Sequence, residues 1–158
     1  MRLWHKDLIS CLPRLQLISQ WKECCCIVSN IAKKGTPEHL LVNKVLMYPV
    51  THFVCYTKCV QDEMISRGYK LSVPAISRYN DNIRIWVAHY NKDFVEVLTN
   101  PNISIKQIYA DWHNDVYLRE CLYNLEEKYL CGGIAQDDWL LIYNKFKNFT
   151  PLVYYEGS

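Results

Sequence analysis

Residues 17–28, LISQWKECCCIV, place an acid beside a base and three consecutive cysteines in a single stretch. Apolar side chains recur in it at steps of four, three, four and three residues: Leu17, Trp21, Cys24, Val28 and Ile31. This spacing is typical of an α-helix with one buried side. The stretch therefore predicts a long amphipathic helix near the N-terminus.

Glu23 lies well away from the apolar side of this helix, at about 100° per residue. It shares its side with Gln16, Ser19 and Asn30, which together form a polar stripe. From periodicity alone, the simplest interpretation of this stripe is a solvent-exposed surface. The spacing leaves open whether Glu23 does more.

The first helix is expected over residues 8–34, where Pro13 is tolerated if the regular part starts there. Gly35 ends it, and Thr36-Pro37 reads as an N-cap followed by proline at the first helical position. A second helix is then expected over residues 37–48 and a third over residues 51–67. Gly68 is the expected C-terminal cap of the third helix.

The second half of the chain also reads as helical. Residues 69–88 are ambiguous, because IRIWV (83–87) alternates like a strand but no partner strand is evident. Further helices are expected over residues 91–101, over residues 113–130 with Asn114 as N-cap, and over residues 136–146. The expectation is an all-α, compact helical bundle in which residues 1–158 form one domain.

Composition narrows the class of protein only coarsely. Half of the residues are hydrophobic and the net charge is +2. This charge permits nucleic-acid binding without arguing for it, so any phosphate-binding surface requires uneven placement of the 18 lysines and arginines. No run of 18 apolar residues occurs, so no membrane span is expected.

Eight cysteines and five histidines raise the question of a metal site. No CxxC pair and no zinc-finger spacing occurs, and three consecutive residues on a helix point about 100° apart. With no signal peptide evident, we expect a cytoplasmic protein with mostly buried, reduced thiols, and no metal or cofactor. The histidines, including His113 in DWHND (111–115), are expected at the surface or in caps.

The N-terminal third carries a more specific signal. LISCLPRLQLISQWKECCCI (8–27) resembles the first helix of the pyrimidine-dimer DNA glycosylases, the phage-type endonuclease V family. The glutamate of that family's pattern falls on Glu23, and EMISRGY (63–69) resembles the end of its next long helix. The resemblance is strongest over residues 1–70 and is closest to a divergent, bacterial-type branch.

The resemblance implies a DNA repair enzyme that acts as a glycosylase and AP lyase on damaged pyrimidines in duplex DNA with a flipped base. It implies that the α-amine of Met1 attacks the sugar and forms a Schiff base, while Glu23 stabilises the cationic sugar. At pH 7, roughly a tenth of α-amines are neutral, against about 0.04% of unperturbed lysines. A terminal amine is thus the better amine nucleophile.

The chain departs from the family pattern at several positions around this helix. Arg2 follows the initiator methionine where the family has a small residue, and Lys22 replaces an arginine. Gln16 replaces a histidine, and Cys26 replaces a DNA-contacting arginine. We expect Arg2, Arg14 and Lys22 to contact nucleic acid, and Gln16, Ser19 and Cys26 to line the pocket.

Three hypotheses remain open. The first is the glycosylase/AP lyase, with Glu23 and Met1 as catalytic residues. The second is a non-catalytic module on the same helical fold that binds nucleic acid, a nucleotide or a protein. The third and weakest is a metal- or redox-linked protein that uses residues 24–26. The lesion, the role of the second half and the oligomeric state stay undetermined.

Overall fold

The computed structural model describes residues 2–34, 38–90 and 103–156. All of its regular elements are helical, and no strand occurs in the described ranges. In chain order the elements are η1 (Lys6–Cys11), α1 (Arg14–Lys34), α2 (Leu40–Leu46), α3 (Val50–Ser66), α4 (Val73–Tyr90), α6 (Asp115–Leu130) and α7 (Gln136–Phe146). The prediction of an all-α bundle with a long N-terminal helix is confirmed.

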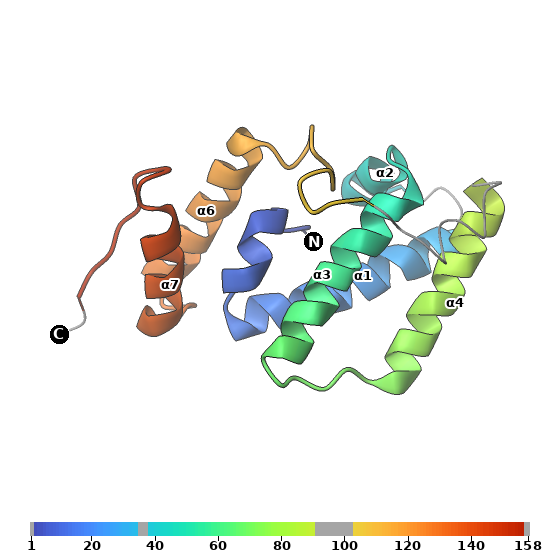
Figure 1. Cartoon of the computed structure of the whole chain (residues 1–158), viewed down its shortest axis with the longest axis horizontal. Helices are drawn as coiled ribbons and strands as arrows, with labels where there is room; N and C mark the ends of the chain where they lie inside the picture. The colour runs from blue at the N-terminus through green and yellow to red at the C-terminus, as the bar shows by residue number, and fades with distance from the viewer. Residues whose placement is uncertain (1, 35–37, 91–102, 157–158) are drawn as a thin grey trace.

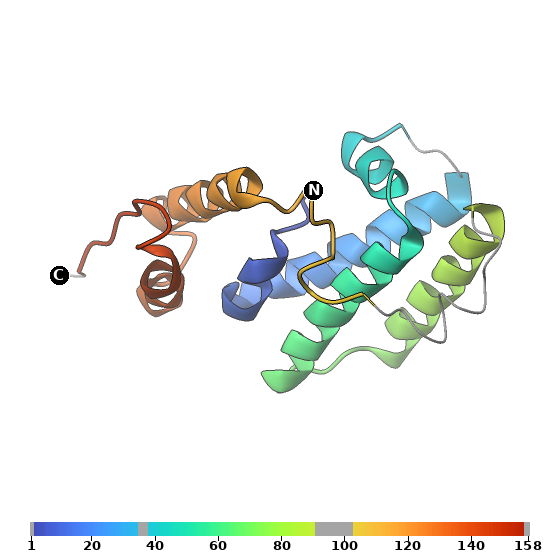
Figure 2. The same ribbon diagram turned by 45° about the horizontal axis from the view of Figure 1, so that its top comes forward.

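Helix α1 is the element around which the first half packs. It contacts α2, α3 and α4, while η1 lies between α3 and α7. Figures 1 and 2 show α4 at one end of the molecule and the α6–α7 pair at the other, with η1 between them. The apolar series predicted in residues 17–31 is buried throughout, so the side that faces the core was assigned correctly.

Proline divides the predicted first helix into two elements. Pro13 pushes Leu12 into an extended conformation (φ −59°, ψ 135°), because the residue before a proline avoids the helical region. The 3-10 helix η1 ends there, and the regular helix begins at Arg14. The chain can therefore turn between η1 and α1, which brings the N-terminus back alongside α1.

The segment EMISRGY forms a structural joint at the end of α3. Glu63 and Arg67 form an ion pair with 2.8 Å between their oxygen and nitrogen atoms. Arg67 also donates to the carbonyls of Leu12 (2.7 Å) and Ser10 (3.3 Å) at the end of η1. Gly68 has φ +79°, a conformation that favours glycine, and so ends α3 as predicted.

Other expectations need correction. Residues 83–87 belong to α4 and not to a strand, because Tyr79, Ile83, Trp86 and Val87 recur at helical spacing and are buried. Helix α2 begins at Leu40 with His39 as its N-cap, so its start is later than expected. The predicted cap at Thr36-Pro37 and the predicted helix over residues 91–101 lie outside the described residues.

Local signals placed the last two helices well. Asn114 accepts a hydrogen bond from the backbone N–H of Tyr117 (3.0 Å) and caps α6, as predicted. Helix α7 spans the predicted residues. None of the helices in the described part of the chain is long and apolar enough to cross a lipid bilayer.

Two histidines lie in the core and not at the surface. His5 and His113 are 2% and 4% exposed, and their rings stack with 5.2 Å between centroids. His5 Nε2 donates a hydrogen bond to the backbone carbonyl of His113. His113 Nδ1 accepts a hydrogen bond from the backbone N–H of Lys6. Burial lowers the pKa of both, that of His113 to about 2, so both are neutral at physiological pH.

Candidate functional site

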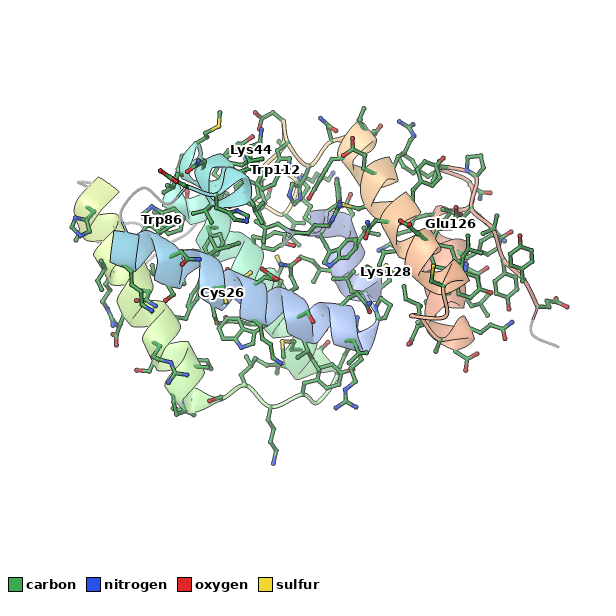
Figure 3. The ribbon with its side chains drawn as sticks, turned by 180° about the vertical axis from the view of Figure 1, so that it is seen from behind. Cys26, Lys44, Trp86, Trp112, Glu126 and Lys128 are labelled. Carbon is green, nitrogen blue, oxygen red and sulfur yellow. The ribbon has the colours of Figure 1, made fainter. Side chains whose placement is uncertain are left out.

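A hollow of about 250 Å³ lies against one side of α1, and we call it the Glu23 pocket. It combines side chains from the N-terminal segment, α1 and α6: Arg2, Trp4, Leu15, Gln16, Ser19, Gln20, Glu23 and Lys128. Figure 3 looks onto α1 and shows Lys128 beside it, where α6 approaches. Four residues predicted for the site, namely Arg2, Gln16, Ser19 and Glu23, are therefore brought together.

Helical geometry places the polar groups of this pocket in a row. Gln16, Gln20 and Glu23 stand at i, i+4 and i+7 along α1, so they share one side of the helix. This side faces the N-terminal segment and is partly covered by it. Glu23 itself is half-buried, so it lies at the border between this covered side and the solvent.

Gln20 ties the beginning of the chain to α1. Its side-chain amide donates to the carbonyl of Arg2 (3.0 Å), and its side-chain oxygen accepts from the N–H of Trp4 (2.8 Å). Gln20 is only 1% exposed, so these bonds form away from competing water. Leaving such buried groups unpaired costs about 1–3 kcal/mol each. These two bonds therefore stabilise the N-terminal segment in its position against α1.

Other side chains complete the attachment of residues 2–6. The hydroxyl of Tyr56 donates to the carbonyl of Trp4 (2.6 Å). The hydroxyl of Tyr117 donates to the carbonyl of Leu3, and His113 Nδ1 accepts a hydrogen bond from the N–H of Lys6. The first residues of the described chain are therefore fixed from both halves of the molecule.

Two acceptors in the Glu23 pocket lack partners among the described residues. They are Glu23 Oε2 and Gln16 Oε1, both of which are buried. A buried carboxylate oxygen without a donor is costly, so it marks a position where a donor or a cation would be stabilised. The Glu23 pocket can therefore accept hydrogen bonds from a positively charged or neutral donor group.

Two cationic side chains border these acceptors. The Arg2 guanidinium lies 5.4 Å from the centre of the Trp4 ring, and its Nη1 is 3.9 Å from Cys121 Sγ. Lys128 comes from the end of α6 and is exposed. Neither forms an ion pair with Glu23 in the described structure, so both remain able to approach an anionic group at the pocket rim.

The remaining predicted residues lie elsewhere. Arg14, Lys22 and Cys26 line a different, largely apolar hollow of about 840 Å³, which we call the Trp21 pocket. It is bounded by α1, the end of α3 and the start of α4. It shares no residue with the Glu23 pocket, which the exposed Leu15 and Ser19 of α1 line. Met1 lies outside the described residues.

Sequence reasoning missed Gln20, Trp4 and Lys128. Gln20 follows the polar side of α1, but the pattern could not show which segment covers it. Lys128 lies at the end of α6, far along the chain, and only the folded chain brings it into the pocket. The spacing of Gln16, Gln20 and Glu23 was the one local signal available.

The three consecutive cysteines have different surroundings. Cys24 is buried and Cys26 is exposed, with Cys25 between them in accessibility. Burial raises the pKa of Cys24 to about 12 and that of Cys25 to about 11, so both stay protonated. None of the eight cysteines forms a disulfide bond. The described part of the chain holds no group of three His, Cys, Asp or Glu residues able to bind a metal.

Comparison with known families gives a match over the N-terminal half. The family model described as pyrimidine dimer DNA glycosylase matches residues 1–77, from the N-terminal segment through α3 into the first turn of α4. No curated protein and no solved structure matches the chain. The match includes every residue of the Glu23 pocket except Lys128. Over residues 1–77, which is just under half of its length, the chain is similar to the pyrimidine dimer DNA glycosylase family.

Proposed function

We propose that this protein is a DNA repair glycosylase and AP lyase that acts on damaged pyrimidines through a Schiff base formed by the α-amine of Met1. Glu23 is the catalytic carboxylate. The whole chain acts as one domain, without a cofactor, in the cytoplasm. The observation that carries the proposal is that Arg2 and Glu23 line one pocket, and that Glu23 Oε2 has no hydrogen-bond partner among the described residues.

Covalent connection limits where the nucleophile can be. The peptide bond to Arg2 keeps the α-amine of Met1 within about 5 Å of the Arg2 Cα atom. Gln20, which lies about one helical turn before Glu23 on α1, donates a hydrogen bond to the Arg2 carbonyl. A terminal ammonium or iminium is also the kind of donor that the buried Glu23 Oε2 lacks.

The reaction follows from these groups. The neutral α-amine attacks C1′ of the damaged nucleotide, the C1′–N bond breaks, and the base leaves with a proton. The amine loses its proton as the sugar opens to the imine, and elimination then breaks the C3′–O bond and nicks the strand. Water hydrolyses the imine and restores the amine. Glu23 stabilises the cationic sugar and carries protons between these steps.

The surface around the pocket supports nucleic acid as the substrate. Arg14 and Lys22 are exposed on α1, and Lys128 extends from α6 at the rim of the Glu23 pocket. Basic side chains on both sides of the pocket suit the two flanks of a phosphate backbone. We propose that the substrate is duplex DNA with a flipped base, because the reacting sugar is shielded inside an intact duplex.

Borohydride trapping tests the proposal. Wild-type protein that begins at Met1 is mixed with abasic or dimer-containing duplex, and the reduced covalent adduct is counted. Glu23→Gln is expected to lower the trapping rate about 100-fold or more, because the developing positive charge loses its carboxylate. Its melting temperature should hold, because Glu23 forms no ion pair among the described residues and its Oε2 accepts no hydrogen bond from them. Glu38→Gln is the matched control, because it removes one exposed carboxylate and changes the net charge by the same amount.

The alternative, a non-catalytic binding module, predicts a different result. Gln16 stands where the family has a histidine, which favours binding without chemistry. Under this alternative, the duplex binds in a salt-sensitive manner, but no adduct forms in wild type and Glu23→Gln changes nothing. Trapping that depends on Glu23 excludes it.

A further inference from the structure

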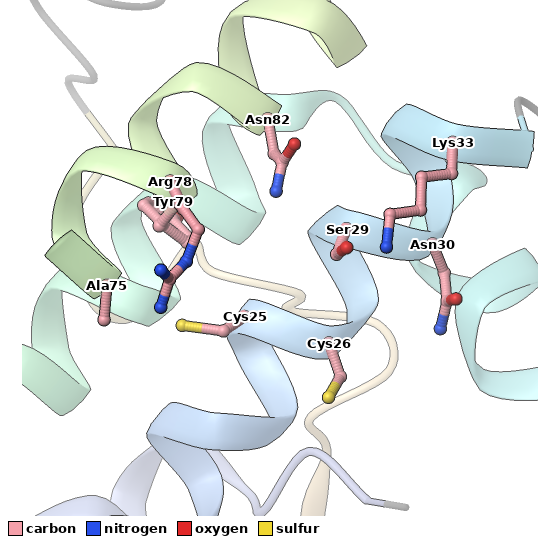
Figure 4. Close-up of a pocket in the computed structure, with 9 residues that line it drawn as sticks. All are labelled: Cys25, Cys26, Ser29, Asn30, Lys33, Ala75, Arg78, Tyr79 and Asn82. Atoms are coloured by element: carbon pink, nitrogen blue, oxygen red, sulfur yellow. The ribbon is translucent and has the colours of Figure 1, made fainter.

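A second polar hollow, of about 400 Å³, lies between α1 and α4, and we call it the Arg78 pocket. It shares no residue with the Glu23 pocket. Figure 4 shows Arg78 and Asn82 on α4, Ser29 and Lys33 on the facing part of α1, and Asn30 at the edge of the pocket. Two helices thus contribute hydrogen-bonding side chains to one space that the proposed chemistry does not use.

The charges in the Arg78 pocket are one-sided. Lys33 and Arg78 are both cationic, and none of the nine lining residues is acidic. Neither cation forms an ion pair within the described structure, whereas the nearby Asp81 pairs with Arg84 at 2.8 Å. Burial raises the pKa of the adjacent Cys25 thiol, so it supplies no competing anion. The pocket therefore offers charged and neutral donors that lack an internal anion.

The Arg78 pocket lies nearer the C-terminal end of α1 than Glu23, where the proposed chemistry takes place. Ser29 and Lys33 follow Glu23 by six and ten residues, which corresponds to about 9–15 Å at 1.5 Å per residue. The Trp21 pocket adjoins the Arg78 pocket, because both are lined by Cys25, Cys26 and Ala75. A DNA strand advances about 3.4 Å per nucleotide, so a strand running along α1 covers this distance in about three or four nucleotides.

We propose that the Arg78 pocket binds a backbone phosphate of the DNA, about three or four nucleotides from the sugar that reacts at Glu23. This inference rests on the proposed function for its choice of DNA. A phosphate oxygen accepts from Arg78 and Lys33, and Ser29, Asn30 and Asn82 add neutral donors. Such a contact anchors the duplex without taking part in the chemistry.

The test compares two double variants with the same charge change. Lys33→Gln with Arg78→Gln removes the pocket cations. Lys58→Gln with Arg84→Gln removes exposed cations that are already paired with Asp62 and Asp81. Binding to an undamaged duplex is measured over a range of salt concentrations. The pocket variant should bind at least about tenfold more weakly, and its slope of log K against log salt should fall by about 1, because one phosphate contact is lost.

The control variant should stay within about twofold of wild type. The inference is overturned if both variants behave alike, or if wild type binds no duplex at low salt. It is also overturned if inorganic phosphate raises the melting temperature of wild type alone while both variants bind duplex equally, since the pocket then serves free phosphate.

Trapping separates this inference from the proposed function. At saturating DNA, the pocket variant should form the borohydride adduct at the wild-type rate, whereas Glu23→Gln should lose the adduct but keep the wild-type salt slope. A reduced slope in the pocket variant, together with no adduct in wild type, would overturn the proposed chemistry and leave the phosphate site standing.

Discussion

Gln20 is the residue on which the geometry of the candidate site depends most. Its single amide group pairs with a carbonyl and an N–H of the N-terminal segment, and the Tyr56 hydroxyl lies 3.1 Å from its side-chain oxygen. A glutamine suits this position because it donates and accepts from neighbouring atoms. We infer that Gln20 is a positioning residue, which acts through the start of the chain and not on the substrate itself.

Replacing Gln20 by leucine should separate positioning from binding. The change leaves the Arg2 carbonyl and the Trp4 N–H without partners, so unfolding should become easier by about 1–3 kcal/mol for each of these two groups. The rate of trapping at saturating DNA should fall at least about tenfold, while the Kd for the duplex changes little. Val60→Ala, in the core of α3, is the control for a loss of stability alone. Equal trapping rates in the two variants would refute the positioning role.

At the scale of the elements, the joint between η1 and α3 determines where the N-terminal segment goes. Pro13 permits the turn, and Arg67 holds the end of η1 by its bonds to Leu12 and Ser10. The segment EMISRGY therefore acts as a structural support for the site. Helix α7 adds to it, because Lys145 Nζ bonds the carbonyl of Asp7 (3.1 Å) and the hydroxyl of Ser10 (2.9 Å).

Arg67→Met tests this joint while keeping most of the apolar stem. The free energy of unfolding should fall by about 2 kcal/mol, because charge-assisted hydrogen bonds are lost and Glu63 loses its partner. Arg84→Met removes an exposed arginine from its pair with Asp81 and should cost no more than about 0.5 kcal/mol. Urea unfolding of the two variants measures the difference, and equal midpoints would contradict the structural role of Arg67.

At this scale, the elements that sequence could predict are those with local signals. Helices α6 and α7 were placed well, because an asparagine cap, a glycine pair and first-turn acids lie within a few residues of their ends. Helix α4 was not, since IRIWV fits a strand as well as a helix until α1 provides a surface to pack against. In the site, Glu23 and Gln16 followed from the resemblance. Gln20 and Lys128 depend on contacts between segments that only the folded chain brings together.

For the molecule as a whole, the N-terminal segment connects the two halves. Gln20 and Tyr56 hold it from the first half, and Tyr117, His113 and α7 hold it from the second. The stacked pair of His5 and His113 lies at the centre of this connection. Burial lowers the pKa of His5 more than Asp7 and Asp115 raise it, and Lys6 lowers it further. Burial, His5 and Lys6 all lower the pKa of His113.

This pair makes stability depend on pH in a defined direction. In the unfolded chain both histidines bind protons below a pH of about 6.5, whereas in the folded chain their pKa is lower. The unfolded state thus binds more protons, and stability is lost as the pH falls below about 6.5, by up to about 1.4 kcal/mol per pH unit for each histidine. Urea midpoints at pH 7.5 and 5.5 should show this loss.

His113→Gln should remove part of that dependence on pH. His39→Asn, which keeps an N-cap acceptor on an exposed residue, should leave the dependence unchanged. If the two variants lose stability equally between pH 7.5 and 5.5, the buried pair is not its source.

The central claim is that the α-amine of Met1 performs the chemistry beside Glu23. The most direct test is peptide mapping by mass spectrometry of the borohydride-reduced adduct between wild-type protein and an abasic duplex. The account predicts a single modified atom, the α-nitrogen of Met1. No adduct, or an adduct on a lysine such as Lys128 at the rim of the same pocket, would contradict it.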